Sequence, residues 1–371
     1  MDDSDTEMKN RIEGCVVGGA IGDALGYQCE FTRGIKEREY TTFKDDYGIF
    51  SDDAQMMLYT INGLLWGTTR HTIRGIAPTV PVCVLLAYRD WYFTQQGTPP
   101  DKRADSVSWI NKIPAMCHRR APGFTCLNAL ASFDGENIPS IDKPINQSKG
   151  CGSTMRVAPI GFLRSSMTDI VEWGAETAAL THGHPLGIIP SAFVAGLIHE
   201  ILYDTKHNLS EQLHIAFEYT NQFATKHFHR QYQQDFTNIM RKAFELSRNN
   251  RRDIDNISQI GEGWVAEEAV AIAVYCCLRH QDDFADAVIA SVNHDGDSDS
   301  TGIIAGNIMG AHLGIEAIPS YYVDHIEQKE LLFELADDFV NGPPFNSLDR
   351  PDDDSPWMIK YYYNKPAKEY Q

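Results

Sequence analysis

Side chains that could bind a metal ion cluster near the C-terminal end of the chain, in the segment NHDGDSDSTG. Four oxygen-bearing residues lie within six positions there, directly before a sequence with helical character: Asp295, Asp297, Asp299 and Ser300. Carboxylates crowded this closely repel one another unless water or a cation separates them, and hard divalent cations such as Mg²⁺ take oxygen ligands of this kind. An acidic loop that caps a buried helix is the alternative, and it explains the cluster equally well when taken alone.

A second oxygen-rich cluster occurs near the N-terminal end, where Ser51, Asp52 and Asp53 precede an apolar run. Serine is a good helix N-cap and acids in a first helical turn suit the helix dipole, so a structural explanation suffices for this cluster by itself. Glu30 adds a carboxylate at the predicted end of another helix. Three segments then offer serine and carboxylate oxygens beside apolar helices, and two adjacent Mg²⁺ ions would need about that many oxygen ligands.

Two glycine repeats indicate how the elements that carry these acids are arranged. Glycine recurs every four residues in two apolar segments, at positions 14, 18, 22 and 26 and at positions 302, 306, 310 and 314. That spacing lines one face of a helix. Because glycine costs a helix roughly 1 kcal/mol per position relative to alanine, its repeated use predicts close packing against another backbone. We therefore expect two glycine-faced helices that cross closely in the core and contact each other.

Asp23 lies inside the first glycine-rich segment, within an apolar stretch. A carboxylate on an apolar helix face needs a hydrogen-bond partner or a metal ion. We favour a structural role as a hydrogen-bond acceptor over direct metal ligation.

The composition restricts the function classes. The chain has 371 residues, of which 43% are hydrophobic, enough for a substantial core. Its net charge of −19, from 32 Lys and Arg against 51 Asp and Glu, argues against broad nucleic-acid binding, which needs a basic surface. No apolar run reaches the ~20 residues that span a bilayer, and the acidic first residues do not resemble a secretory signal. We expect a cytoplasmic protein that binds neither membrane nor nucleic acid, with eight cysteines as reduced thiols.

The middle of the chain holds three features that suit an organic ligand. The small residues Gly-Cys-Gly-Ser-Thr at 150–154 would let backbone N–H groups approach phosphate oxygens, although an ordinary turn has the same composition. His182 and His184 flank a glycine, but no cysteine or third histidine lies at a spacing that supports zinc; His182 suits ligand contact or packing. Trp264 opens a predicted helix, and its flat face suits stacking on a base or core packing.

Six motifs occur in an order that points to a known family. They are GGAIGDALG with the trailing CEF, SDDAQM, GCGSTMRVAPIGF, THGHP, GEGWVAEEAV and DGDSDSTGIIAGNIMGAHLG, within residues 11–315. Each is weak alone, but together and in this order they resemble the ADP-ribosylglycohydrolase family of DraG-like and ARH-like enzymes. The resemblance implies an all-α fold, a compact orthogonal helical bundle, and hydrolysis of the N- or O-glycosidic bond that joins ADP-ribose to a protein side chain.

The resemblance also implies a pair of Mg²⁺ ions, with Mn²⁺ as an alternative. By match of position the metal ligands would be Ser51, Asp52, Asp53, Asp297, Asp299 and Ser300. Glu30 matches the family's flexible acidic residue, and Asp52, Asp53 or Glu30 would take the proton of the attacking water. The small-residue run would hold the diphosphate and distal ribose. The implied ADP-ribose contacts are Gly150, Gly152, Ser153, Met155, His182 and Trp264.

Two positions depart from the family's pattern. Ala54 stands where relatives often have threonine, and Cys151 stands where they often have asparagine. We therefore expect one hydroxyl contact and one side-chain hydrogen bond to be absent from the site, while the carboxylates are retained.

No Gly/Ser-rich linker or internal repeat divides the chain. We expect an acidic N-terminal extension (1–10), a single all-α domain (11–345) and a polar, aromatic C-terminal tail without helical periodicity (346–371). The expected function is Mg²⁺-dependent removal of ADP-ribose from modified protein substrates, with arginine as the expected attachment site. A competing hypothesis is an immunity protein whose N-terminal arm binds and blocks an ADP-ribosyltransferase toxin, with or without hydrolysis. A catalytically silent scaffold is disfavoured because the acids are retained.

Overall fold

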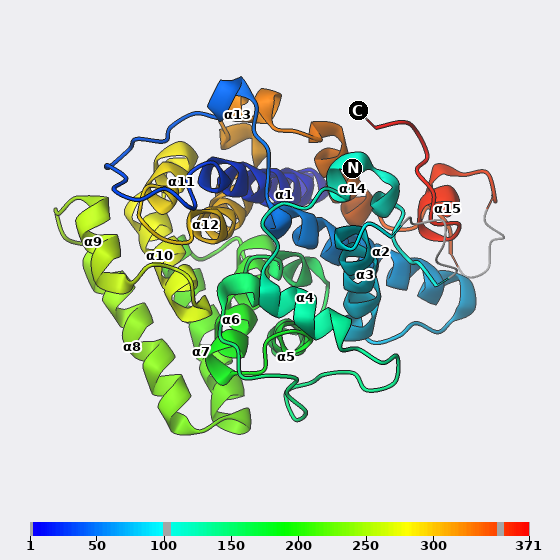
Figure 1. Cartoon of the computed structure of the whole chain (residues 1–371), viewed down its shortest axis with the longest axis horizontal. Helices are drawn as coiled ribbons and strands as arrows, with labels where there is room; N and C mark the ends of the chain where they lie inside the picture. Colours follow the sequence, from blue (N-terminus) through cyan, green and yellow to red (C-terminus); the bar gives the residue numbers. More distant parts are fainter. Residues whose placement is uncertain (1–2, 99–104, 347–351, 371) are drawn as a thin grey trace.

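The computed structural model describes residues 3–98, 105–346 and 352–370, and the regular elements in these ranges are all helices (Figure 1). This confirms the predicted all-α fold. The α-helices are α1 (Asp3–Tyr27), α2 (Asp52–Arg74), α3 (Val80–Gln95), α4 (Phe124–Ala131), α5 (Met167–Ala179), α6 (Pro185–Tyr203), α7 (Leu209–His227), α8 (Arg230–Ser247), α9 (Asp253–Ile260), α10 (Ala266–Arg279), α11 (Phe284–Val292), α12 (Ser298–Leu313), α13 (Ser320–His325), α14 (Lys329–Asn341) and α15 (Pro356–Tyr361). Short 3-10 helices lie between them: η1 (Lys44–Asp46), η3 (Ile110–Lys112), η4 (Pro114–Met116), η5 (Cys151–Ser153), η6 (Ala158–Phe162) and η7 (Ile315–Ala317).

The two glycine faces pack against each other, as predicted: α1 and α12 form the centre of the fold (Figure 1). The contacts run in antiparallel order, pairing Gly14 with Gly310, Gly18 with Gly306, Gly22 with Gly302 and Gly26 with Ser298. A Cβ atom added at Gly306 would lie 2.0 Å from the carbonyl oxygen of Gly18, so only glycine permits this approach. The antiparallel order brings the C-terminal end of α1 to the N-terminal end of α12, where Asp297 and Asp299 lie.

The N-terminal residues belong to this central helix from Asp3 onwards, because α1 begins there. The described part of the expected N-terminal extension is therefore continuous with the helix that carries the first glycine repeat. Lys9 pairs with Asp337 of α14 at 2.7 Å, and the backbone N–H of Glu316 donates to Asn10 Oδ1 at 3.3 Å. These contacts tie the start of α1 to the segment that follows α12.

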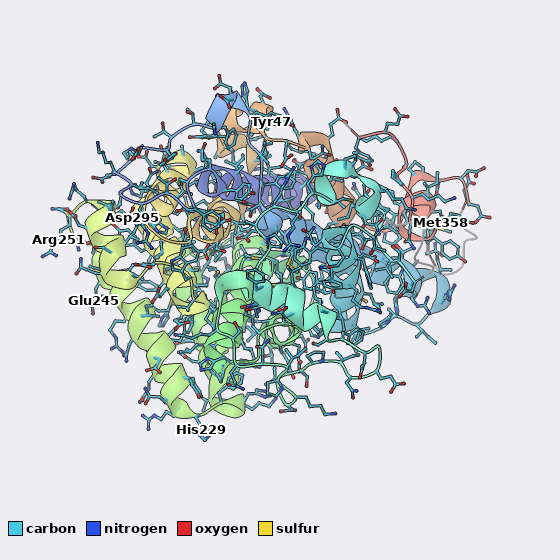
Figure 2. All side chains as sticks on the ribbon, viewed as in Figure 1. Tyr47, His229, Glu245, Arg251, Asp295 and Met358 are labelled. Carbon is cyan, nitrogen blue, oxygen red and sulfur yellow. The ribbon has the colours of Figure 1, made fainter. Side chains whose placement is uncertain are left out.

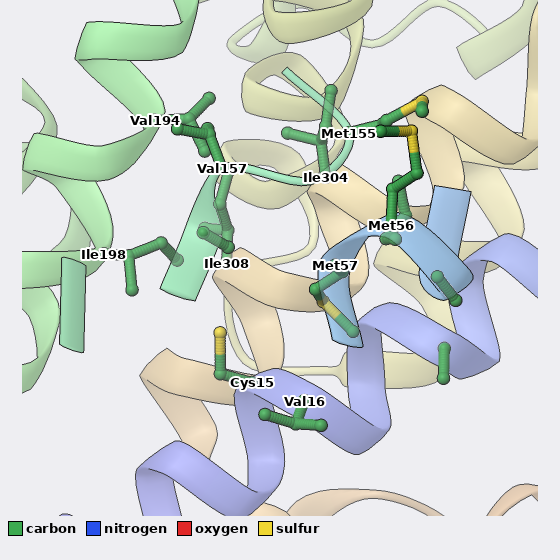
Figure 3. Close-up of a cluster of buried hydrophobic side chains, with 14 of the residues drawn as sticks. Cys15, Val16, Met56, Met57, Met155, Val157, Val194, Ile198, Ile304 and Ile308 are labelled. Atoms are coloured by element: carbon green, nitrogen blue, oxygen red, sulfur yellow. The ribbon is translucent and has the colours of Figure 1, made fainter. Parts of the chain in front are cut away.

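Side chains from α1, α2, α6 and α12 pack into one core (Figure 3). The fully buried members in that view include Cys15, Val16, Met56, Met57, Val194, Ile198, Ile304 and Ile308. By length and composition alone α6 could cross a membrane, but 89% of its apolar window is buried inside the protein. Such burial is what the core helix of a folded domain shows.

The outer elements close this core. Helices α7 and α8 follow α6 along the chain, and Arg251 points outward from the turn after α8 (Figure 2). The C-terminal tail contains α15, which was not predicted because six residues are too few to show a period. Ser355 caps α15, and Trp357 Nε1 donates to Thr69 Oγ1 of α2 at 2.9 Å.

Candidate active site

The two oxygen-rich clusters predicted to converge lie side by side at the N-terminal ends of α2 and α12. Ser51 caps α2, with its Oγ accepting from the backbone N–H of Asp53 at 3.1 Å. Asp297 caps α12, with Oδ1 accepting from the backbone N–H of Ser300 at 3.3 Å. Ser300 Oγ donates to Asp53 Oδ2 at 2.7 Å, which joins the two caps directly. The clusters from opposite ends of the chain therefore converge, as the sequence predicted.

Asp23 supports this junction from behind. Its Oδ1 accepts from the backbone N–H of Ser51 at 2.9 Å, and its Oδ2 accepts from that of Ala54 at 2.8 Å. The side chain is fully buried. Asp23 is thus a structural hydrogen-bond acceptor, as favoured, and it fixes the first turn of α2 against α1.

The carboxylates at the junction repel one another and are poorly solvated. Burial is the largest cause that raises the pKa of Asp52, Asp53 and Asp297 well above the usual range, and the nearby Asp299 carboxylate raises each further. Burial also raises the pKa of Glu30 to about 10, with Asp299 and Asp297 as the next causes. Among the described residues, no lysine or arginine forms an ion pair with these five carboxylates; the buried Arg120 pairs with Glu327 and the buried Lys360 with Glu334.

This arrangement fits a divalent cation. Glu30, Asp297 and Asp299 can each place one carboxylate oxygen within 4.8 Å of the others. Glu30 Oε2 is buried and has no hydrogen-bond partner. A cation would separate the charges and supply the missing partner of Glu30.

A cavity of about 230 Å³ opens over the carboxylates. The predicted residues that line it are Glu30, Asp52, Asp53, Gly150, Gly152, Met155, His182, Trp264, Asp297, Asp299 and Ser300. The other two predicted residues, Ser51 and Ser153, are fully buried and lie outside the cavity lining. The Ser51 hydroxyl caps α2, and the Ser153 hydroxyl donates to the carbonyl oxygen of Gly187 at 2.7 Å. Their roles as metal ligand and ligand contact stay predictions.

Apart from the five acids, the residues that line the cavity are uncharged. Burial and the nearby Arg156 guanidinium lower the pKa of His182 to about 3, so its imidazole is neutral at physiological pH. Arg156 Nη2 donates to Thr181 Oγ1, and that hydroxyl lies 2.8 Å from His182 Nδ1. Because an arginine can only donate, the hydroxyl is free to donate its proton to Nδ1. Nε2 then carries the imidazole proton, on the side that faces Gly150 and Gly152.

The family model described as ADP-ribosylglycohydrolase matches residues 4–347. The chain belongs to the ADP-ribosylglycohydrolase family. It is accordingly an enzyme that hydrolyses a glycosidic bond.

Relatives of this ADP-ribosylglycohydrolase come from all domains of life. An uncharacterized protein from Archaeoglobus fulgidus is 32% identical over 340 residues, covering 89% of this chain and 95% of its own. ADP-ribosylhydrolase ARH3 from Bos taurus is 27% identical, covering 88% and 91%. ADP-ribosyl-(dinitrogen reductase) glycohydrolase from Rhodospirillum rubrum is 21% identical, covering 87% and 92%. A solved ADP-ribosylglycohydrolase-related protein complex shares the fold, with a TM-score of 0.62 at 21% identity over 91% of this chain and 99% of that one.

One departure from the family's pattern has a visible consequence. We expected a side-chain hydrogen bond to be lost at Cys151, but its thiol donates to Asp297 Oδ2 at 2.8 Å. Cys151 also lines the cavity. The acidic cluster of this ADP-ribosylglycohydrolase therefore keeps a donor at that position, although a softer one than an amide.

The segment before and within the start of α4 contributes cavity residues that the sequence analysis missed. Phe124 lines the cavity and has 75% of its surface exposed, and Trp264 lines it with 41% exposed. Such exposure excludes the core interpretation of Trp264. Ala121 also lines the cavity, with a φ of 53°, and Pro122 and Gly123 separate it from Phe124. The signal available was an aromatic residue directly after Pro-Gly, where no apolar periodicity requires one.

Proposed function

We propose that this chain removes ADP-ribose from modified protein side chains in a reaction that depends on Mg²⁺, and that arginine-linked ADP-ribose is its preferred substrate. The observation that carries the proposal is one cavity lined both by carboxylates without an ion-pair partner among the described residues and by an uncharged run of small residues with the neutral His182. Relatives named for ADP-ribosyl hydrolysis, from cattle and from Rhodospirillum rubrum, match nearly the whole chain.

Two Mg²⁺ ions would be held by Asp52, Asp53, Asp297, Asp299 and Ser300, with Glu30 beside them. Bound there, Mg²⁺ would supply a Lewis acid for the attacking water and the ribose hydroxyls. Glu30 is the candidate base because its side chain lines the cavity and its buried Oε2 has no hydrogen-bond partner. Asp52 and Asp53 are the alternatives, and the carboxylates together would stabilise the cationic sugar that forms as the bond breaks.

The uncharged part of the cavity lining suits the anionic half of the substrate despite the chain's net charge of −19. Gly150 and Gly152 allow close approach of phosphate oxygens because they carry no Cβ. The Nε2–H of the neutral His182 would donate to such an oxygen. Trp264 and Phe124, both exposed at the cavity, offer flat faces on which adenine could stack.

The preference for arginine rests on charge. Arginine-linked ADP-ribose retains a cationic guanidinium, whereas the serine-linked form is uncharged at the attachment site. Five carboxylates line the cavity, and among the described residues no lysine or arginine does, so a cationic guanidinium at the cavity would be stabilised.

The location proposed for the protein is the cytoplasm. All eight cysteines are free thiols in the structure, which supports this location.

The direct test is incubation of the protein with arginine-linked and serine-linked ADP-ribosyl substrates, each with Mg²⁺, with Mn²⁺ and with EDTA. We expect ADP-ribose release from the arginine-linked substrate, with Mg²⁺ or Mn²⁺ and not with EDTA. Release only from the serine-linked substrate would overturn the linkage, and release in EDTA would overturn the metal role. Inhibition of an ADP-ribosyltransferase without any release would favour the immunity function instead.

Replacing Trp264 with alanine is expected to weaken ADP-ribose binding about tenfold or more, because base stacking contributes roughly 1–3 kcal/mol. Calorimetric titration with ADP-ribose measures the effect. Trp66→Ala is the matched control, since Trp66 is partly buried on α2 and does not line the cavity. Equal losses in the two variants would show that Trp264 does not stack on the ligand.

Replacing Thr181 with valine is expected to weaken ADP-ribose binding about three- to tenfold, the value of one hydrogen bond. Valine keeps the shape but cannot pass a proton to Nδ1, so the imidazole proton would leave Nε2 for Nδ1. Nitrogen NMR of His182 reports this change of tautomer. Thr181→Ser restores the hydroxyl and should restore both the tautomer and the affinity; an unchanged tautomer in Thr181→Val would contradict the assignment.

A further inference from the structure

A buried ion pair lies directly behind the acidic wall of the cavity. Arg120 and Glu327 are 8% and 4% exposed and form a two-pronged pair, Nη1 with Oε1 and Nη2 with Oε2 at 3.0 Å. The Arg120 guanidinium also lies over the Phe50 ring, 5.3 Å from its centroid. The two charged residues are 207 positions apart, so their pairing fixes the relative placement of distant segments.

The pair holds the residue that precedes the first metal-ligand cluster. Arg120 Nη1 donates to the carbonyl oxygen of Phe50 at 2.8 Å, and the backbone N–H of Phe50 donates to Glu327 Oε1 at 2.9 Å. The backbone N–H of Asp52 donates to the carbonyl oxygen of Arg120 at 3.2 Å. Both polar groups of the Phe50 backbone and the first residue of α2 are therefore bound to this ion pair or to its backbone.

One member of the pair, Arg120, also lies next to Ala121 and Gly123 in the sequence, which line the cavity. Arg120 is followed by Ala121, which lines the cavity in the left-handed region, and the backbone N–H of Gly123 lies 3.4 Å from Asp52 Oδ2. On the Glu327 side, its backbone N–H donates to the carbonyl oxygen of Gly48 at 2.9 Å. Three separate segments, at residues 48–52, 120–123 and 327, are thus joined next to Asp52.

We infer that Arg120 and Glu327 are positioning residues that set the placement of the α2 carboxylates relative to those of α12 and so determine the affinity for divalent ions. The inference rests on the proposed metal-dependent function. Neither residue lines the cavity, so neither contacts the ion or the substrate. They act through Phe50 and the first turn of α2, as outer residues do when they orient metal ligands.

The test measures Mn²⁺ binding by calorimetry and electron paramagnetic resonance, and thermal stability in EDTA, for Arg120→Met and Glu327→Gln. The matched control is Lys360→Met, which breaks another buried ion pair, with Glu334 at 2.8 Å and with Asp338, far from the cavity. We expect all three variants to lower Tm. Only the two at Arg120 and Glu327 should weaken Mn²⁺ binding, by about 10- to 100-fold.

A double variant separates placement from stability. Arg120→Met combined with Glu327→Met removes both charges, so Tm should recover towards the unsubstituted value because no buried charge is left alone. The bonds to Phe50 remain broken, and Mn²⁺ affinity should stay low. The inference is overturned if Arg120→Met binds Mn²⁺ as tightly as the unsubstituted protein, or if Lys360→Met weakens binding equally. A lack of Mn²⁺ binding in the unsubstituted protein would overturn the metal role first, and the inference with it.

Discussion

Replacing Asp53 with asparagine is expected to lower the rate of ADP-ribose release by more than about 10²-fold, because changing a group behind a metal ligand already costs about 10- to 100-fold. Asp53 is the one α2 carboxylate that bonds directly to the α12 cluster, through Ser300. Asparagine keeps its size but removes the charge that would bind the ion. Release of ADP-ribose measured by chromatography, with Mg²⁺ present, gives the rate. Asp282→Asn, an exposed carboxylate in the turn before α11, should leave it unchanged.

The same variant is expected to be more stable than the unsubstituted protein when ions are removed. The pKa of Asp53 is raised in the folded state, so the folded protein binds protons more tightly there than the unfolded chain does. Stability from this group is present at low pH and is lost as pH rises above the unfolded pKa of about 3.9 towards the folded value. In EDTA, Asp53→Asn should therefore gain Tm relative to the unsubstituted protein, more at pH 8 than at pH 5. Saturating Mg²⁺ should remove or reverse the gain. A lower Tm for Asp53→Asn in EDTA at pH 8 would contradict the claim that repulsion between the carboxylates destabilises the ion-free protein.

Replacing Gly306 with alanine is expected to destabilise the fold by about 3 kcal/mol or more, at the upper end of what overpacking costs. The new Cβ would lie 2.0 Å from the carbonyl oxygen of Gly18, and backbone cannot yield as a flexible side chain can. Because α12 carries Asp297 and Asp299 at its N-terminal end, any shift that relieves the clash also moves these acids. Urea unfolding gives the stability, and Mn²⁺ titration reports the displacement.

Gly123→Ala is the control for this experiment. A Cβ at Gly123 meets nothing within 4 Å, and its φ of −60° is open to any residue. We expect its stability to change by less than about 1 kcal/mol. Similar losses in both variants would show that the glycine contact between α1 and α12 does not hold the fold together.

The sequence allowed prediction of those features that follow from local spacing. The four-residue glycine repeats predicted both helices and their contact, and the oxygen-rich clusters predicted which acids converge. The antiparallel order of the pairing could not be predicted, because the repeat itself is the same in either direction. It comes from the three-dimensional path, in which Gly26 meets Ser298.

Other parts of the site could not be recognised from periodicity or from motif spacing. Phe124 faces the cavity from a helix of only eight residues, after a loop whose Ala121 has a positive φ that neither its type nor its neighbours indicate. Arg120 and Glu327 lie in unrelated segments, and no spacing links them until the fold brings them together. Ser51 and Ser153 were chosen for their hydroxyls, but side-chain type does not reveal that those hydroxyls face backbone instead of the cavity.

The antiparallel contact of α1 with α12 also has a consequence for synthesis. Helix α1 packs against residues 298–313, so its glycine face stays uncovered during synthesis until the ribosome has translated the nearly 300 positions up to α12. Contacts this distant along the chain form late in folding. A nascent chain halted before residue 298 would have no route to a completed site, and its exposed first helix would be a target for chaperones and proteases.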